Sequence, residues 1–327
     1  MRTLYRSMTV LSTLALASAG VALGAGSASA GLTTSCEGDA SDTTVPGELV
    51  VKEGNSCVLD SVTINGSVEV QAGADLLITN SSVAEGVEVA ADGYFDSTGS
   101  EVAGDVTSTA GYGVYLDETT VDGAYTGDAG EGADPFLYSY DSSIAGDVTV
   151  GQGLVHLQTV NVGGPVSTEG ALYTDIVDST LADDLTVSGN AEGATFCGSE
   201  VDGASTFTGN TGVQIGTGGA IIDCEDGNYF GSDLTVSDNT DGVDVSSAII
   251  RGALSGEGND PAPTGSDLRV RGEVSGQFVD LSPASQKMSL KAQSAVESHS
   301  STLDTKRDER RAVAEEQAEL SGPANLG

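Results

Sequence analysis

Acidic side chains are the residues in this 327-residue chain whose spacing could do chemistry. The stretch SDNTDGVD, residues 237–244, places Asp238, Asp241 and Asp244 three residues apart, and carboxylate oxygens are ligands that Ca²⁺ prefers. The stretch lacks the D-x-D-x-D-G alternation and the distal glutamate of a calcium loop, and the nonapeptide repeats of calcium-binding β-rolls are missing. We interpret it as a solvated turn, with Ca²⁺ binding as the weaker alternative, and expect no other cofactor.

Two adjacent carboxylate pairs, Asp183-Asp184 and Glu225-Asp226, raise the question of glycoside hydrolysis, which uses two carboxyl groups on one sugar bond. Neighbours on a strand point to opposite faces, so adjacency does not build such a pair. A polysaccharide lyase commonly uses Arg or Lys as its base, and residues 54–249 contain neither. We therefore name no catalytic residue and expect a protein that is not an enzyme.

Aromatic and imidazole side chains give a similarly weak indication of a binding site. The chain has no Trp, and Tyr112, Tyr115, Tyr138 and Tyr140 cluster in sequence. Packing between repeats, or a place on a loop surface, explains these tyrosines better than stacking on sugars. His156, alone in LVHLQ, is interpreted as a tolerated repeat residue and not as a ligand.

The formal net charge of −37 at pH 7 restricts the partners. So acidic a surface repels nucleic acid and anionic lipid. We attribute it to solubility in a salty or cation-rich exterior, with calcium binding as the alternative. The partners that remain are cell-wall polymer, polysaccharide or another copy of the chain.

A ladder of repeats sets the fold. One repeat contains the stretch AGDVTV, residues 145–150, with Gly146 as its second residue. The equivalent position in successive repeats is occupied by Gly66, Glu85, Gly104, Gly123, Gly146, Gly164, Asp183, Gly203, Ser232 and Gly252. Most steps are 18 to 20 residues, and the two longer steps, after Gly123 and Gly203, indicate inserted loops. Such short units bury little surface alone and must stack on one another.

Each repeat alternates apolar and polar residues, rich in Val, Ile and Thr, between Gly or Asn turns, which predicts strands. We predict an all-β fold: a right-handed parallel β-helix, or solenoid, of about ten rungs of 18–20 residues. Variable steps fit this hand better than the strict hexapeptides of a left-handed helix, and a β-sandwich is the rival fold. The recurring Gly serves either a turn closed to residues with a Cβ or close packing at a corner.

Four cysteines, Cys36, Cys57, Cys197 and Cys224, indicate disulfides in an oxidising compartment. Four cysteines allow three pairings. We favour Cys36–Cys57 and Cys197–Cys224, because each pair is separated by about one to one and a half repeats. No Cys-x-x-Cys motif supports a metal site.

Residues 1–30 have the pattern of a secretory signal peptide. Arg2 and Arg6 precede the apolar run MTVLSTLALASAGVALGA, and Ala28-Ser29-Ala30 fits a small-x-small cleavage site. No second apolar run of spanning length follows. We expect an exported chain without a membrane span, secreted and extracellular or associated with the cell surface.

The stretch NSCVLDSVTINGSVEVQAGADLLITNSSV (residues 55–83) resembles a family of secreted actinobacterial repeat proteins, largely uncharacterised. The rungs at 197–215 and 224–245 are similar to that family's C-x-x-N-x-x-x-G-x-L-x-V-x-x-N-T-G rungs. The resemblance covers residues 36–265 and implies a right-handed parallel β-helix. It implies no activity, and the tail after residue 280 has no counterpart.

The C-terminal segment differs in composition from the repeats. It is rich in Ala, Glu, Lys and Arg, with Ser282-Pro283 as a helix start and Ser321-Gly322-Pro323 as a stop. Its TKRDERR stretch holds the densest positive charge of the mature chain. Three alternatives stay open: a helix docked on the acidic surface of its own or a neighbouring chain, contact with anionic wall polymer, or a flexible charged tail.

The expected organisation is a signal peptide (1–30), an N-terminal cap segment (31–60), a parallel β-helix (61–265), a linker (266–282) and a charged helical or flexible tail (283–327). The function expected from this organisation is that of an exported, non-enzymatic structural, surface or adhesion-type protein. A polysaccharide-active enzyme or a carbohydrate-binding β-helix is the alternative.

Overall fold

The structure is a computed structural model. It describes residues 32–130, 134–217, 221–222, 224–282 and 290–326, without the side chains of residues 290–304. All the described residues belong to one compact unit, residues 31–327. The signal peptide therefore lies outside the described residues and stays a prediction. Everything below concerns this unit.

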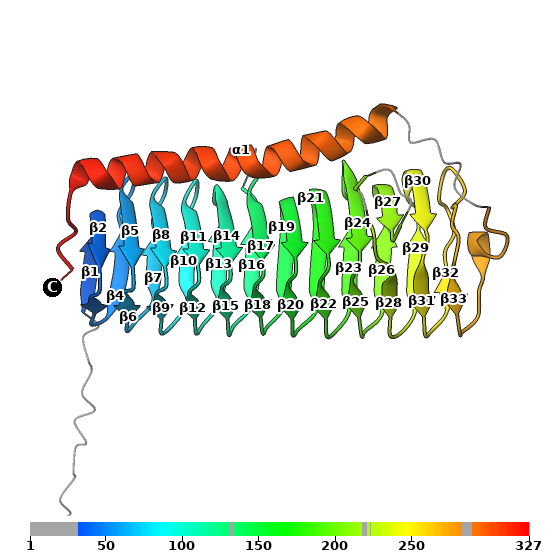
Figure 1. The fold of residues 1–327 in the computed structure, drawn as a ribbon, viewed down its shortest axis with the longest axis horizontal. Coiled ribbons are helices and arrows are strands. Elements are labelled where there is room, and N and C mark those ends of the chain that lie inside the picture. The colour runs from blue at the N-terminus through cyan, green and yellow to red at the C-terminus, as the bar shows by residue number, and fades with distance from the viewer. Residues whose placement is uncertain (1–31, 131–133, 218–220, 223, 283–289, 327) are drawn as a thin grey trace, which may run out of the picture. The chain divides into compact units, whose positions relative to one another are not determined.

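Short parallel strands stack into a β-solenoid with three faces, and one strand of each face contributes to each turn (Figure 1). The first face contains β1 (Thr33–Cys36), β4 (Glu48–Val51), β7 (Val68–Val70), β10 (Val87–Val89), β13 (Val106–Thr109), β16 (Tyr125–Asp128), the first parts of β19 (Val148–Gln158) and β21 (Val166–Val177), β23 (Leu185–Ser188), β26 (Ser205–Thr208), β29 (Leu234–Ser237) and β32 (Leu254–Ser255).

The second face contains β2 (Gly38–Ser41), β5 (Ser56–Asp60), β8 (Asp75–Thr79), β11 (Tyr94–Thr98), β14 (Gly113–Asp117), β17 (Phe136–Tyr140), the second parts of β19 and β21, β24 (Gly193–Cys197), β27 (Thr211–Ile215) and β30 (Thr240–Val245). Because β19 and β21 run through the corner between these two faces, the two faces form one 21-stranded sheet.

The third face is a separate 12-stranded sheet of very short strands. It contains β3 (Thr44–Val45), β6 (Thr63–Ile64), β9 (Ser82–Val83), β12 (Glu101–Val102), β15 (Thr120–Val121), β18 (Ser143–Ile144), β20 (Asn161–Val162), β22 (Thr180–Leu181), β25 (Glu200–Val201), β28 (Asn228–Phe230), β31 (Ala248–Ile250) and β33 (Arg269–Val270). The solenoid thus has about twelve turns rather than ten, because residues 33–60 and 266–270 also take part in the stack.

One apolar core runs through all the turns. Residues of equivalent position lie directly above one another, as in the pairs Val68–Val87 and Val87–Val106 of the first face. The inward side chains of all three faces are almost completely buried in a single cluster. Each turn therefore depends on its neighbours for burial, as the repeat pattern predicts.

The recurring glycine packs closely at the corner between the third and first faces. A Cβ on Gly66 would lie 2.7 Å from the backbone nitrogen of Glu48, and one on Gly104 would lie 2.7 Å from that of Gly86. Neither Gly66 nor Gly104 has a positive φ. Of the two roles proposed for this glycine, close packing is therefore the one that operates.

Left-handed residues occupy a different corner, the one between the second and third faces. There φ lies between 45° and 59° at Asp42, Ser61, Asn80, Gly99, Glu118, Asp141, Thr159, Asp178 and Gly198. Asx-type and polar residues fill most of these positions, since they tolerate this conformation better than β-branched ones, although Thr159 also adopts it.

Ladders of side-chain hydrogen bonds tie successive corners together. The backbone N–H of Ser179 donates to Oγ of Ser199 at 3.0 Å. At the corner between the first and second faces, the N–H of Asn210 donates to Oδ1 of Asn239 at 2.9 Å, and the N–H of Asn239 donates to Oδ1 of Asn259 at 3.2 Å. Asn210, Asn239 and Asn259 therefore form an amide ladder that connects successive turns.

Both disulfides join neighbouring coils. Cys36, at the end of β1, is bonded to Cys57 in β5, and Cys197, at the end of β24, is bonded to Cys224. These are the two pairings that the sequence favours. Cys36 and Cys57 lie inside the core, so this bond links the first two turns and does not hold a separate cap over them.

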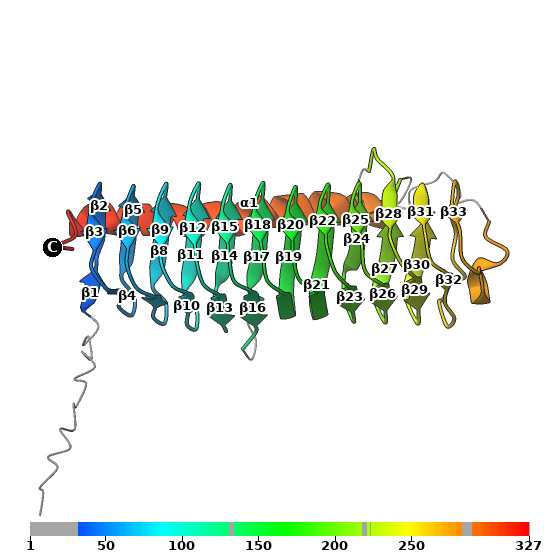
Figure 2. The ribbon, with the colours of Figure 1, turned by 90° about the horizontal axis from the view of Figure 1, so that it is seen from below.

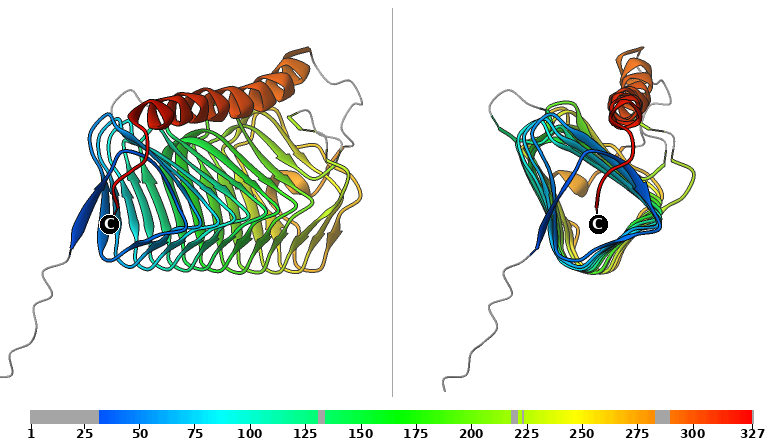
Figure 3. Two further views of the ribbon diagram at one scale, coloured as in Figure 1. Left: turned by 60° about the vertical axis from the view of Figure 1, so that its left-hand side comes forward. Right: turned by 90° about the vertical axis from the view of Figure 1, so that its left-hand side faces the viewer.

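Helix α1 (Leu290–Ser321) ends where the Ser-Gly-Pro stop predicts. The residues that follow the helix, 322–326, cover the N-terminal end of the solenoid (Figure 3). Asp39 donates its N–H to the carbonyl of Gly322 at 3.2 Å, and Ala324 donates its N–H to the carbonyl of Asp39 at 2.7 Å. Leu326 is 4% exposed and belongs to the main core. At the other end, the 3₁₀ helix η1 (Gly276–Phe278) places Phe278 in the same core.

Candidate functional site: the second face under helix α1

The outward side of the second face is aromatic and acidic, unlike the other two. Strands β8, β11, β14, β17, β19 and β21 place their outward residues in two adjacent columns. The columns contain Asp75, Tyr94, Phe136, Leu154 and Tyr173, and Leu77, Asp96, Tyr115, Tyr138, His156 and Asp175. The apolar members form a second buried cluster outside the solenoid core.

Aromatic rings pack on one another in and beside these columns, both within a strand and between successive turns. Phe136 and Tyr138 stack with ring centroids 4.2 Å apart, and Tyr112 meets Phe136 edge-on at 5.7 Å. Tyr115 and Tyr140 lie 5.7 Å apart. The four tyrosines singled out in the sequence are thus brought to one face, and packing between turns accounts for them.

Arg310 of α1 is bound to this face by a buried carboxylate. Its Nε donates to Oδ1 of Asp75 at 2.6 Å, and its Nη2 donates to the carbonyl of Asp92 at 2.9 Å. The guanidinium also lies over the ring of Tyr112, 4.9 Å from the centroid. The side chain of Asp75 is only 4% exposed. Burial raises the pKa of Asp75, while the charge and hydrogen bond of Arg310 act against that rise.

Arg311 makes the equivalent contact one turn further along the solenoid. Its Nη1 lies 3.2 Å from Oδ1 and 3.3 Å from Oδ2 of Asp96, which is 1% exposed. The hydroxyl of Tyr94 donates to the same carboxylate at 2.6 Å. Burial raises the pKa of Asp96, which the Arg311 charge opposes, and burial beside Asp96 raises the pKa of Tyr94 well above its ordinary value. These groups form a buried network whose charges depend on the helix.

Further contacts follow the helix along the turns. Arg307 lies 5.0 Å above the ring of Tyr115 and donates to its hydroxyl at 3.2 Å. Tyr112 donates its hydroxyl to the carbonyl of Lys306 at 2.8 Å. Among the helix side chains that the structure describes, residues 305–321, only Ala314 and Ala318 are buried. Ion pairs and cation–π contacts, rather than apolar packing, therefore hold α1.

The cationic stretch of α1 thus docks on the acidic surface of its own chain, one of the alternatives left open by the sequence. Sequence reasoning names the TKRDERR stretch that contains Arg310, but it singles out neither Asp75 nor Asp96 as its partner. The docking site could have been inferred from two sequence features together: acidic residues at outward strand positions, and a single arginine-rich segment near the C-terminus.

His156 lies on the same outward face, in β19. Its Nδ1 is 3.9 Å from Oδ2 of Asp175, and its Nε2 is 3.3 Å from Oε1 of Gln158. The hydroxyls of Tyr138 and Tyr173 are 3.1 Å apart, and burial raises the pKa of both phenols. His156 is therefore a buried repeat residue with polar side chains of its own and the next turn beside it.

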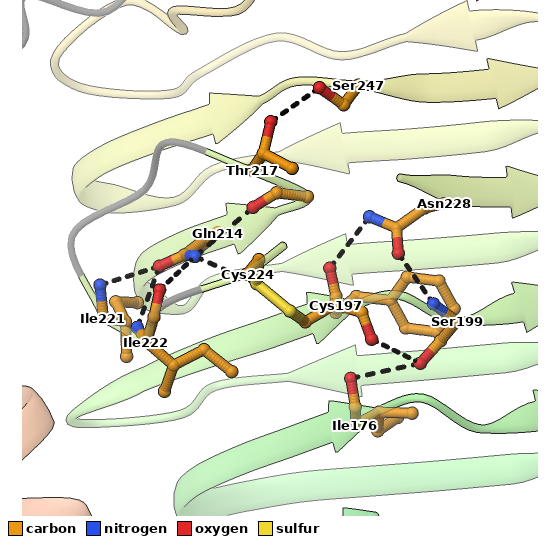
Figure 4. Close-up of a disulfide and its surroundings, with 12 residues drawn as sticks. Ile176, Cys197, Ser199, Gln214, Thr217, Ile221, Ile222, Cys224, Asn228 and Ser247 are labelled. Atoms are coloured by element: carbon orange, nitrogen blue, oxygen red, sulfur yellow. Dashed lines mark hydrogen bonds between the residues drawn. A yellow bond between two sulfur atoms is a disulfide. The ribbon is translucent and has the colours of Figure 1, made fainter. Parts of the chain in front are cut away.

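A disulfide-bonded loop lies on the second face farther along, and Gln214 organises it (Figure 4). Oε1 of Gln214 accepts the backbone N–H groups of Ile221 at 2.7 Å and Ile222 at 3.1 Å. Its Nε2 donates to the carbonyl of Ile222 at 2.7 Å and contacts Sγ of Cys224 at 3.3 Å. One buried amide therefore fixes the loop that carries the exposed Glu225.

The carboxylate pair Asp183-Asp184 has a structural use at a corner. Oδ1 of Asp184 accepts the N–H of Ala204 in the next turn at 2.7 Å, and Oδ1 of Asp183 accepts the N–H of Asp184 at 2.8 Å. Oδ1 of Asp233 accepts the N–H of Ala253 in the same manner, at 2.7 Å. These acids stabilise corners of the stack.

The three calcium candidates occupy two different environments. Asp244, in β30, accepts hydrogen bonds from Oγ of Ser246 at 2.7 Å and Oγ1 of Thr264 at 2.8 Å. Asp238 and Asp241 are exposed and have φ of 56° and 59°. Within the described ranges, no group of three or more His, Cys, Asp or Glu side chains is arranged around a metal position. Calcium binding at Asp238, Asp241 and Asp244 stays a prediction.

In comparisons with known proteins, no family model, no curated protein and no solved structure matches this chain. Among the residues described, no helix has the length and apolar character needed to cross a membrane. The structure is a parallel β-solenoid with two disulfides, which is consistent with the repeat proteins that the sequence resembles.

Proposed function

We propose that this protein is an exported, non-enzymatic structural or surface protein, whose solenoid presents a long acidic and hydroxyl-rich exterior. Parallel β-solenoids are stiff because every turn shares its backbone hydrogen bonds and its core with two neighbours. The two disulfides fit an oxidising location.

The observation that carries the proposal is the closure of the second face by α1. Arg310 and Arg311 occupy the carboxylates Asp75 and Asp96, which would otherwise be the best-placed acids on an aromatic surface. The first face, in contrast, presents outward hydroxyls in eight consecutive turns. They are Thr107, Thr126, Thr149, Ser167, Thr186, Thr206, Thr235 and Ser255. The accessible exterior is thus suited to hydration and lateral contact.

The proposal is tested by locating the chain and assaying it. Antibodies against the purified protein should label intact cells or detect it in the medium, and the chain should not turn over a panel of neutral polysaccharides, with or without Ca²⁺. Detection only inside cells, or robust product release, would overturn it.

Carbohydrate binding is the second candidate, because aromatic side chains line the second face. If α1 covers a sugar-binding surface, the Arg310→Ala/Arg311→Ala variant should bind polysaccharide that the parent does not bind. Glu316→Ala/Glu319→Ala, which changes two exposed helix residues, is the matched control.

A further inference from the structure

The last four turns of the third face carry an ordered set of charges. Strands β25, β28, β31 and β33 lie side by side there (Figure 2). Their register stacks Glu200, Tyr229, Ile249 and Arg269 in one column. Two residues further along each turn, a second column contains Asp202, Gly231, Arg251 and Arg271. We call these eight residues the C-terminal patch.

Three arginines make the C-terminal patch distinctive. Arg251, Arg269 and Arg271 are exposed, and the structure shows no side-chain hydrogen bond or ion pair between them and any described residue. Their carboxylate neighbours at the edge of the patch are Asp267 and Glu273, also exposed. Since residues 54–249 contain no Lys or Arg, these three arginines are a local group of positive charges on an acidic solenoid.

The apolar members of the patch also face solvent. Ile249 is 38% exposed, and Tyr229 beneath it is partly exposed. Arginine and tyrosine are enriched in the energetically important positions of protein interfaces, and an aliphatic residue between them adds apolar area. The composition therefore fits a protein partner.

The order of the rows is complementary to itself. Along the stack, an acidic row (Glu200 and Asp202) is followed by Tyr229 with Gly231, then by Ile249 with Arg251, and finally by a basic row (Arg269 and Arg271). A two-fold axis that runs parallel to the strands, between the second and third rows, reverses this order. It places each basic row opposite an acidic row, and each Ile249 opposite a Tyr229.

We propose that the C-terminal patch is an isologous interface through which two copies of this chain associate in antiparallel fashion, third face against third face. Arg269 meets Glu200 of the second copy, and Arg271 meets Asp202. Both pairs occur twice, because the interface is two-fold symmetric. Arg251 then lies over Gly231, where no side chain obstructs it.

A second copy fits these observations better than a polyanion does. A polyanion that bound Arg269 and Arg271 would also meet the acidic row of the same patch and a chain of net charge −37. Only a partner with the reversed order of charges satisfies both ends of the patch. Long-range repulsion between two acidic copies is screened at physiological salt, where the Debye length is about 8 Å, whereas contacting pairs are screened less.

The expected dimer is weak. Adjacent turns are about 4.8 Å apart, so the four rows span only about 14 Å. A contact of this size is smaller than standard specific interfaces and belongs with weak, transient associations. Sedimentation velocity over a micromolar concentration series at physiological salt is therefore the appropriate measurement.

The experiment uses charge exchange on residues 31–327. Arg269→Glu/Arg271→Glu and Glu200→Arg/Asp202→Arg should each raise the dimer dissociation constant at least tenfold, because like charges then face each other. An equimolar mixture of these two variants should form a heterodimer with nearly parental affinity, because every opposed pair is restored. The chain with all four substitutions should again form a homodimer. Lys52→Glu, which changes an exposed cation in the first turns, should leave the parental dimer unchanged.

Several results would overturn the proposal. They are a parent that stays monomeric throughout the series, a mixture that does not associate, or Lys52→Glu acting as strongly as the patch variants. Binding of polyphosphate to a monomeric parent, lost in Arg269→Glu/Arg271→Glu, would assign the patch to an anionic polymer instead. Unchanged melting temperatures in the variants show that the effects are not losses of fold.

Discussion

Replacing Arg310 with alanine should release helix α1 from the solenoid in a pH-dependent way. The substitution removes the 2.6 Å bond to Asp75, the 2.9 Å bond to the carbonyl of Asp92 and the contact with the Tyr112 ring. It leaves the carboxylate of Asp75 buried, with Ser56 as its remaining side-chain partner at 3.3 Å. An uncompensated buried charge is the largest consequence.

The expected magnitude follows from the burial of this pair. Removing one partner of a buried ion pair destabilises a protein by about 3–5 kcal/mol. Because the Arg310 side chain is 18% exposed, we take the lower end, about 3 kcal/mol. This corresponds to about a 150-fold rise in the equilibrium constant for opening of the helix.

The sign of the pH dependence follows from Asp75. Burial raises its pKa in the docked state above the ordinary value of 3.8, so the docked state binds the proton more tightly than the undocked state. Without Arg310 this pKa rises further. The electrostatic part of the loss is therefore fully present above the docked-state pKa, and it disappears as the pH falls through that pKa towards 3.8.

Hydrogen exchange of the backbone amides of residues 310–321 measures this opening directly, without requiring the whole stack to unfold as one unit. Exchange should accelerate about 150-fold at neutral pH and much less near pH 4, after correction for the intrinsic rate. Asp75→Asn/Arg310→Ala should exchange more slowly than Arg310→Ala at neutral pH, and Glu319→Ala is the exposed control. Equal acceleration at both pH values, or no recovery in the double variant, would refute the reasoning.

Three further predictions concern the stack. Gly123→Ala should lower the free energy of unfolding, measured by urea denaturation, by about 2–3 kcal/mol, because the new Cβ would lie 2.5 Å from the carbonyl carbon of Gly104 in the preceding turn. Gly151→Ala is the control and should be nearly neutral, because the nearest atom to its Cβ would be 3.4 Å away. Asn239→Ala should cost about 2 kcal/mol by interrupting the amide ladder, and the exposed Thr240→Ala much less, by the same assay. Deleting residues 322–327 should accelerate hydrogen exchange in the first turn and leave the last turns unchanged; uniform acceleration would contradict the end-closing role.

The solenoid could be predicted from the sequence because its causes are local and repeated. A position filled mostly by glycine recurs at most steps every 18 to 20 residues between alternating strands, and it marks the register that the structure shows from Gly66 to Gly252. The two outermost turns were missed for a physical reason. Gly47 and Gly272 continue the ladder, but the segments around them contain prolines and charges that obscure the alternation.

The docking of α1 could not be predicted in detail because its contacts are remote in sequence. Arg310 and Asp75 are 235 residues apart, and no local pattern assigns one arginine to one aspartate among so many acids. The left-handed corner was missed for another reason. Residues as different as Glu118 and Thr159 adopt the same conformation there, so the geometry is imposed by the stack and not by a residue type.

The closing of the first turn by the last residues gives this protein an order of completion. Synthesis proceeds from the N-terminus, so all the coils are available before Gly322, Ala324 and Leu326 emerge. Until then the first strand edge and the top of the core are open, and an open edge pairs readily with other chains. A chain that lacks Gly322, Ala324 and Leu326 is consequently left with an unprotected first turn. The first turn, which is synthesised earliest, is therefore covered only after residues 322–326 have been synthesised.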